Sequence, residues 1–136
     1  MSEFKIFHSL KLAAVAALGM PVLAFAPLPE ARAQTYYGAI TYSEATRTHG
    51  FSYDYSTRAG AESRAVNECE NVSGRGDCYV LVWFRNACGA LAESYDKRAY
   101  GSGWGSDRAI AEQYALQSCS QYGSGCSVTR WVCTTR

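Results

Sequence analysis

The sequence has few of the residues that metalloenzymes and nucleic-acid-binding proteins use at their sites. It contains two histidines, of which only His49 lies beyond the first 33 residues, and it has no Cys-x-x-Cys pair. A structural zinc site needs four such ligands and a catalytic one three, so a metal site is not expected. From Gln34 onward, ten Lys and Arg balance ten Asp and Glu, with no basic stripe or charge block. This balance argues against nucleic acid or an anionic membrane as the partner.

No apolar run is long enough for an ordinary membrane span of about 20 residues. The longest, residues 12–26, has 15 residues and is followed by two prolines, and residues 31–33 fit the small-x-small rule for cleavage. Residues 1–33 are therefore predicted to be a secretory signal peptide, with an uncleaved membrane anchor as the alternative. We expect residues 34–136 to form a single domain, exported to the periplasm or the medium, with no membrane span after signal cleavage.

Long aliphatic side chains are scarce in this part of the chain, whereas Tyr, Trp, Gly and Ser are abundant. Such a composition predicts short strands, tight turns and large aromatic contacts, and it does not suit a helical bundle. A core built from 103 residues of this kind gives only marginal stability by itself. All six cysteines lie in this part, as expected for a protein that folds in an oxidising compartment.

An internal duplication is the firmest inference from the sequence. Residues 37–43 match 88–94, residues 58–69 match 108–119 without a gap, and Cys78, Val80 and Trp83 match Cys126, Val128 and Trp131. Gly, Arg, Glu, two Cys and Trp thus recur in the same order, as in proteins built from repeats. The predicted repeats are residues 36–84 and 88–133.

Each repeat carries the pattern strand, strand, helix, strand. The predicted strands are 36–43, 49–55 and 79–84, then 88–95, 98–104 and 127–132; the predicted helices are 58–69 and 108–119. Ser56 or Thr57 is expected to cap the first helix, and Ser106 or Asp107 the second. The fold class is therefore α+β, with two tandem ββαβ repeats related by pseudo-two-fold symmetry and a mainly antiparallel, disulfide-stabilised sheet. The unbroken apolar run at 79–84 predicts a strand covered on both faces, with Trp83 in the core.

Six cysteines allow 15 pairings, and their spacing alone does not choose among them. The duplication does, because equivalent positions are expected to carry equivalent bonds. Cys69 and Cys119 end the helices, while Cys78 and Cys126 open the following strands, so the predicted pairs are Cys69–Cys78 and Cys119–Cys126. Cys88 and Cys133 remain, and their bond requires the first and last strands of the second repeat to be antiparallel neighbours.

The candidate catalytic and cofactor-binding motifs all have simpler interpretations. His49 is placed in a hairpin turn, where a single histidine is usually solvated. Glu62 and Glu112 each follow an arginine by four residues, which favours an anchoring role over acid–base work. Residues 101–106 lack the dinucleotide and P-loop spacings, so their glycines are expected to form bulges and make room for Trp104. Residues 75–77, Arg-Gly-Asp, read as a turn. No catalytic, cofactor-binding or metal-ligating residue is therefore predicted.

The candidate binding surface consists of aromatic residues around the second strand of each repeat: Tyr53, Tyr55, Tyr100 and Trp104. Tyr and Trp combine apolar area with a polar group, so an exposed set could bind a glycan or another protein. Core packing is the alternative for the same four residues.

Four blocks of the sequence resemble a known family: residues 37–40 (Tyr-Gly-Ala-Ile), 58–69 (with Arg58-Ala, Ala61-Glu62 and Cys69), 82–91 (Val-Trp-Phe-Arg-Asn-Ala-Cys-Gly-Ala-Leu) and 103–105 (Gly-Trp-Gly). They are similar to a bacterial secreted family of unknown function, number four-one-eight-nine among such domains, which includes mycobacterial members. The resemblance implies export and a small disulfide-bonded domain, and it supplies no catalytic residues. We expect a non-enzymatic binding or interaction module with an unknown protein or glycan partner. The alternatives are an inhibitor or accessory of an envelope enzyme, a secreted effector, and a hydrolase of unfamiliar type.

Overall fold

The computed structural model of the chain describes residues 18–19, 21, 23–29 and 33–134. The chain divides into two units, Met1–Ala31 and Arg32–Arg136. The signal peptide predicted for residues 1–33 lies largely outside the described residues. Within the described ranges, no helix is both long and apolar enough to cross a membrane.

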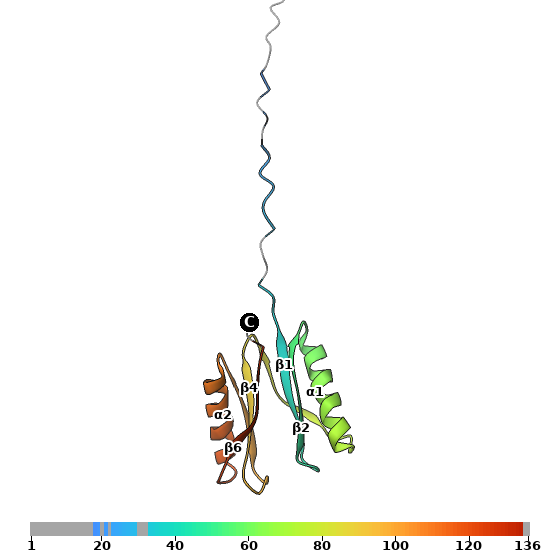
Figure 1. The fold of residues 1–136 in the computed structure, drawn as a ribbon, viewed down its shortest axis with the longest axis vertical. Helices are drawn as coiled ribbons and strands as arrows, with labels where there is room; N and C mark the ends of the chain where they lie inside the picture. The colour runs from blue at the N-terminus through green and yellow to red at the C-terminus, as the bar shows by residue number, and fades with distance from the viewer. Residues whose placement is uncertain (1–17, 20, 22, 30–32, 135–136) are drawn as a thin grey trace, which may run out of the picture. The chain divides into compact units, whose positions relative to one another are not determined.

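The second unit contains all eight elements that the sequence predicts, with shifted ends (Figure 1). In chain order they are β1 (Tyr37–Ser43), β2 (Thr48–Tyr55), α1 (Arg58–Ser73), β3 (Tyr79–Arg85), β4 (Cys88–Glu93), β5 (Tyr100–Gly105), α2 (Arg108–Ser120) and β6 (Ser127–Cys133). Thr57 caps α1 and Asp107 caps α2, each accepting a hydrogen bond from a backbone N–H of the first turn. Helix α1 extends four residues beyond its predicted end and stops at Gly74, which adopts φ = 64°.

The strands form two antiparallel sheets, ordered β2-β1-β3 and β5-β4-β6. The first strand of each half is thus central, and the other two are its edges. The fold is α+β, as predicted. The most apolar strand, β3, is an edge strand and is not covered on both faces: Phe84 is buried, but Trp83 is 38% exposed. The prediction of a deeply buried Trp83 is therefore wrong. Trp83 and Phe84 are neighbours on β3, but their side chains face different surroundings, and only the side chain of Phe84 is covered.

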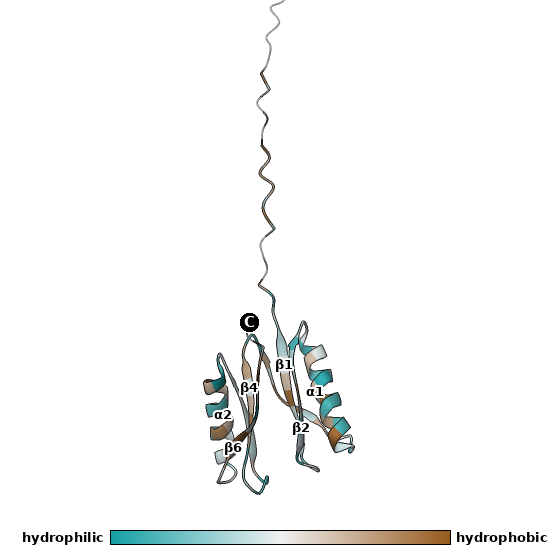
Figure 2. Ribbon diagram, in the orientation of Figure 1, coloured by the Kyte–Doolittle hydropathy of each residue, from teal (hydrophilic) through white to brown (hydrophobic). Residues whose placement is uncertain are grey.

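The two sheets face each other between the two helices (Figure 1). Side chains of β1 alternate accordingly: Ala39 packs against α1, whereas Ile40 and Tyr42 pack against residues of the second sheet such as Leu91. Figure 2 shows hydrophilic residues on both helices and pale or brown residues along β1 and β4. The Tyr42 hydroxyl crosses between the sheets and donates a hydrogen bond of 2.7 Å to Glu93, which is 3% exposed.

Helix α2 lies unusually close to β5 because glycine alternates along that strand. A Cβ on Gly103 would lie 2.5 Å from the backbone nitrogen of Ala115, and one on Gly101 would lie 2.3 Å from that of Cys119. Both helical residues are fully buried, together with Ala111, which lies one turn earlier in α2. These glycines therefore allow the backbone of α2 to pack directly against β5. The expectation that they form bulges and make room for Trp104 is corrected accordingly.

The structure contains three disulfides, Cys69–Cys78, Cys119–Cys126 and Cys88–Cys133. They are the pairs that the sequence predicts. Cys88 and Cys133 are register partners on β4 and β6, with Cα atoms 3.9 Å apart. That bond therefore joins the first and last strands of the second sheet, while the other two each tie the end of a helix to the next strand.

Candidate functional site: an aromatic groove between β3 and β5

The two sheets meet along two sides, β2 against β6 and β3 against β5, and different side chains fill the two sides. At the middle of β1, Ile40 pairs with Phe51 of β2 and with Val82 of β3. At the middle of β4, Leu91 pairs with Ser102 of β5 and Arg130 of β6. The β2/β6 side thus receives Phe51 and Arg130 at this level, and the β3/β5 side receives the smaller side chains of Val82 and Ser102.

The β2/β6 side is closed by Arg130. Its guanidinium lies over the Phe51 ring, 4.4 Å from the centroid, and its Nε donates a hydrogen bond of 3.1 Å to His49 Nε2. Burial, followed by the nearby Arg130 charge, lowers the pKa of His49 below its ordinary value. The histidine lies in β2 and is half-buried, so the prediction of a solvated turn residue is wrong. The turn itself occupies residues 44–47.

The β3/β5 side is open. Two pockets of about 390 Å³ each lie along it, within the size range of small-ligand sites. The first is lined by Tyr79, Leu81, Tyr100, Ser102 and Tyr122, together with Arg98, Ala99, Gly101 and Ser118. The second is lined by residues Leu81, Val82, Trp83, Phe84, Arg85 and Trp104. The pockets share Leu81, and we call the two together the aromatic groove.

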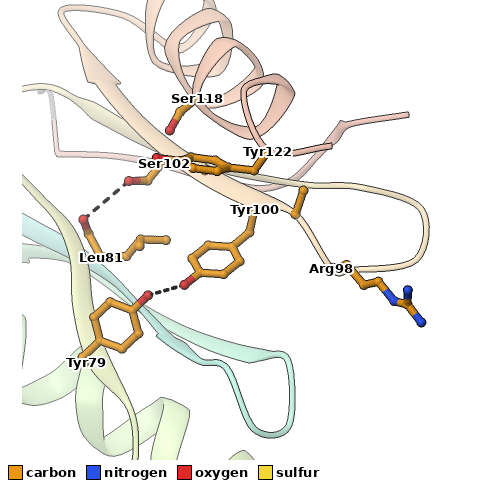
Figure 3. A pocket seen from close by; sticks show the side chains of 9 residues that line it. Tyr79, Leu81, Arg98, Tyr100, Ser102, Ser118 and Tyr122 are labelled. Carbon is orange, nitrogen blue, oxygen red and sulfur yellow. Dashed lines mark hydrogen bonds between the residues drawn. The ribbon is translucent and has the colours of Figure 1, made fainter. Parts of the chain in front are cut away.

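A chain of hydroxyl groups fixes the tyrosines of the first pocket (Figure 3). The Tyr79 and Tyr100 hydroxyls point toward each other, 2.7 Å apart, and Tyr100 also contacts the Glu44 carboxylate. Since a carboxylate only accepts, Tyr100 donates to Glu44 and Tyr79 donates to Tyr100, while the Tyr79 hydroxyl also lies 3.4 Å from the Glu44 carboxylate. Burial, and then the hydrogen bond to Glu44, raise the pKa of Tyr100, and burial raises that of Tyr79. Both hydroxyl groups therefore stay protonated, and their hydrogen bonds hold the two rings in defined positions on the groove wall.

The structure separates the four predicted surface residues. Tyr100 and Trp104 lie in the aromatic groove, and Trp104 is 58% exposed. Tyr53 is 51% exposed, but it lines a different recess together with Tyr55, between β2 and α1. No described pocket is lined both by Tyr100 or Trp104 and by Tyr53 or Tyr55.

Sequence reasoning missed Tyr79, Trp83 and Tyr122 as groove residues. Tyr122 is 76% exposed just beyond α2, and Tyr79 and Trp83 are partly exposed on β3. The two strand residues were assigned to a core strand because of the apolar run around them. Their large, amphipathic side chains on the last strand of the first half were the available signal.

The other candidates have structural roles. Glu62 binds Arg58 at 2.6 Å, and the Arg58 guanidinium stacks 4.1 Å from the Trp83 ring; Arg108, with Glu112 and Trp131, repeats this arrangement. The carboxylates thus anchor each helix to the last strand of its half.

Asp77, in the Arg-Gly-Asp tripeptide, is engaged within the fold. Its carboxylate accepts hydrogen bonds from the Ser43 and Ser73 hydroxyls and the Ala45 N–H. The Ser43 bond is the main reason that the pKa of Asp77 is lowered. Asp77 lies near Glu70 and Cys78, a grouping with metal-ligand geometry, but Cys78 is held in a disulfide and Glu70 accepts two backbone N–H groups.

Comparison with known proteins places the chain in a family. The model described as "Domain of unknown function (DUF4189)" matches residues 37–133. The chain belongs to the DUF4189 family. This confirms the resemblance seen in the sequence, and the matched region contains all strands and helices of the described residues and the whole aromatic groove.

The DUF4189 relatives include mycobacterial proteins. Protein Rv1269c of Mycobacterium tuberculosis (strain ATCC 25618 / H37Rv) and Protein Mb1300c of Mycobacterium bovis are each 43% identical over 103 residues, covering 76% of this chain and 73% of the relative. The NMR structure of Rv1813c from Mycobacterium tuberculosis is similar at a TM-score of 0.55 and 27% identity, covering 96% of this chain and 99% of that one.

Proposed function

We propose that this chain is an exported, non-enzymatic interaction module that binds its partner in the aromatic groove. The observation that carries the proposal is the difference between the two sides of the sheet pair. Phe51 and Arg130 close one side, whereas Val82 and Ser102 leave the other open and lined by exposed aromatic side chains.

The lining of the groove suits recognition. Trp and Tyr dominate the residues that contribute most to binding free energy in protein interfaces, because they bury large areas at a small cost in side-chain entropy. Trp83, Trp104, Tyr79 and Tyr122 are all at least 38% exposed. A cluster of such residues on a small domain is the usual sign of a contact surface.

Export and duplication belong to the same proposal. Three disulfides and the predicted signal peptide support an oxidising location, in the periplasm or the medium. Equal element order, equal strand order and paired Glu–Arg–Trp arrangements support two ββαβ repeats related by a pseudo-two-fold axis.

The test is partner capture by the immobilised, oxidised protein from envelope and culture-supernatant fractions. Trp104→Ala is the test variant, and Tyr53→Ala is the matched control, since Tyr53 is similarly exposed but lies outside the groove. Both changes should alter the free energy of unfolding by about 0.5 kcal/mol or less. We expect Trp104→Ala to weaken capture by about 30-fold or more, as for a residue central to an interface.

Equal capture by Trp104→Ala and wild type would refute the proposal, as would loss of capture by Tyr53→Ala alone. The nature of a captured partner separates the alternatives: an envelope enzyme would indicate an inhibitor or accessory, and a glycan would indicate a lectin-like module.

A further inference from the structure

The backbone of β3 forms part of the wall of the aromatic groove. Among the strands of the described residues, β3 pairs only with β1, so its other edge has no hydrogen-bonded strand neighbour there. Five consecutive residues, Leu81 to Arg85, line the second pocket. Because successive side chains of a strand point to opposite faces of the sheet, such a run can line one pocket only if the edge of β3 faces that pocket. The Leu81 carbonyl is also turned into the groove, where it accepts a long hydrogen bond of 3.4 Å from the Ser102 hydroxyl (Figure 3).

An open strand edge beside side-chain pockets is the arrangement that binds extended peptides. The peptide adds a strand to the sheet through main-chain hydrogen bonds, and alternate side chains enter the pockets. A peptide N–H at the usual distance of about 2.9 Å would bind the Leu81 carbonyl better than the Ser102 hydroxyl does at 3.4 Å.

The charges along the groove have one sign. Arg98 lines the first pocket and Arg85 the second, and no acidic side chain lines either. Among the described residues, the ion pairs do not include Arg85, and Arg98 has only a loose, exposed contact of 3.9 Å with Asp96. Such an exposed contact contributes little, so both guanidinium groups are free to bind an anion.

The neighbouring recess has the same bias. Beyond Tyr100 it is lined by Arg47, Lys97 and Arg98, against one acidic side chain, Glu44. Glu44 already accepts the Tyr100 hydroxyl. A ligand that follows β3 therefore meets cationic groups at both ends of an aromatic centre.

From this geometry we propose that the groove binds an acidic polypeptide segment in extended conformation, alongside the edge of β3. Its carboxylates contact Arg85 and Arg98, and an apolar or aromatic side chain between them packs against Leu81 and Trp104. The inference rests on the proposed function, because it names the class of partner that the groove takes.

The experiment uses a phage-displayed library of random linear peptides, selected on the immobilised oxidised protein. We expect the enriched peptides to carry Asp or Glu on both sides of an apolar or aromatic residue. Synthetic copies should then bind about tenfold more weakly to Arg85→Glu and to Arg98→Glu, and more weakly as salt concentration rises. Arg75→Glu is the matched control: it makes the same charge change on an exposed residue outside both pockets and should leave binding unchanged.

Main-chain pairing has its own readout. N-methylation of alternate residues of the synthetic peptide should abolish binding in one register and spare it in the other, because only every second N–H of an added strand faces its neighbour. Equal binding of both N-methylated series would overturn strand addition.

Three results would overturn the inference: enrichment of neutral or basic peptides, equal weakening by Arg75→Glu, or arginine-dependent binding of an oligo-uronate without any enriched peptide. Its failure is distinguishable from failure of the proposed function. If Trp104→Ala abolishes partner capture but both arginine reversals leave it intact, only the acidic-peptide inference fails. If Trp104→Ala has no effect on capture, the groove itself is wrong.

Discussion

The packing of Phe84 between two glycines gives a sharp test of how the two sheets are joined. A Cβ added to Gly89 would lie 2.3 and 2.5 Å from ring atoms Cε1 and Cδ1 of Phe84, and one added to Gly38 would lie 2.4 Å from Cε2 on the other edge of the same ring. The ring is 1% exposed and cannot move away from one glycine without approaching the other. Neither glycine has a positive φ, so alanine fits the backbone at both sites.

The expected cost follows from this geometry. Gly89→Ala overpacks the contact and should destabilise the protein by about 1–3 kcal/mol, less a gain of about 0.4–1 kcal/mol from a stiffer unfolded chain. Phe84→Leu alone should cost about 1–1.5 kcal/mol. In the Phe84→Leu background, the ring atoms that Gly89→Ala would strike are mostly absent. The second substitution should then be close to neutral.

Gly38→Ala provides the control within the same cluster. Its added Cβ would also lie 2.7 Å from the backbone carbonyl oxygen of Ser52, which no side-chain change removes. Phe84→Leu should therefore rescue Gly89→Ala almost fully and Gly38→Ala only in part.

Urea unfolding followed by the fluorescence of the three tryptophans measures all five variants. With a slope of about 1–2 kcal/mol per M, the expected losses shift the midpoint by about 1 M. The two substitutions should show a coupling free energy of about 1 kcal/mol or more. If the effects of Gly89→Ala and Phe84→Leu add within about 0.5 kcal/mol, the ring does not bridge the two central strands and the description of the junction is wrong.

Two further predictions concern covalent and pH-dependent stability. Replacing Cys88 and Cys133 together by serine should lower the free energy of unfolding by about 4 kcal/mol, against about 2.5 kcal/mol for either other disulfide, because it opens a loop of 45 residues and not 9 or 7. Thermal unfolding of the three paired variants checks this order. A smaller loss of stability for the Cys88–Cys133 variant than for the others would contradict it. The lowered pKa of His49 means that the unfolded chain takes up a proton at this residue more readily than the folded chain does. Stability present above about pH 6.5 should therefore decline as the pH falls below that value. His49→Gln should flatten this decline in urea midpoints measured from pH 8 to 4. An unchanged pH profile in His49→Gln would show that the burial of His49 and its contact with Arg130 do not govern acid stability.

Much of the fold follows from local signals in the sequence. The buried residues of each helix recur every four positions, and the caps are among the residues predicted for them. They are Ala61, Ala65 and Cys69 in α1, and Ala111, Ala115 and Cys119 in α2. The sequence similarity of the two halves identified Cys69–Cys78 and Cys119–Cys126, because the same two positions recur in each half, and Cys88–Cys133 followed as the remaining pair. These features depend on short stretches of chain, where periodicity and capping chemistry are informative.

The order of the strands did not follow from local signals. Hydrophobicity singled out residues 79–84 as the most buried strand, but β1 and β4 occupy the sheet centres. Strand order is set by which strands pair across long sequence separations, and burial of β1 comes from Ala39 facing a helix and Ile40 facing the other sheet. Likewise, the register of β2 moved His49 out of the turn and brought it against Arg130, 81 residues away in the chain.

The aromatic groove illustrates the same limit from the other direction. No single stretch of sequence marks it, because its walls come from β3, β5 and the segment after α2. The groove exists because Val82 and Ser102 occupy one side of the sheet pair, whereas Phe51 and Arg130 occupy the corresponding positions on the other side. Only the registers of the two sheets show that these positions correspond. Two halves with the same order of elements and strands thus produce one closed side and one open side, because the side chains at these four positions differ in volume. We therefore expect substitution at one or two of these positions to open or close such a groove while the disulfides and the helix–sheet contacts stay unchanged.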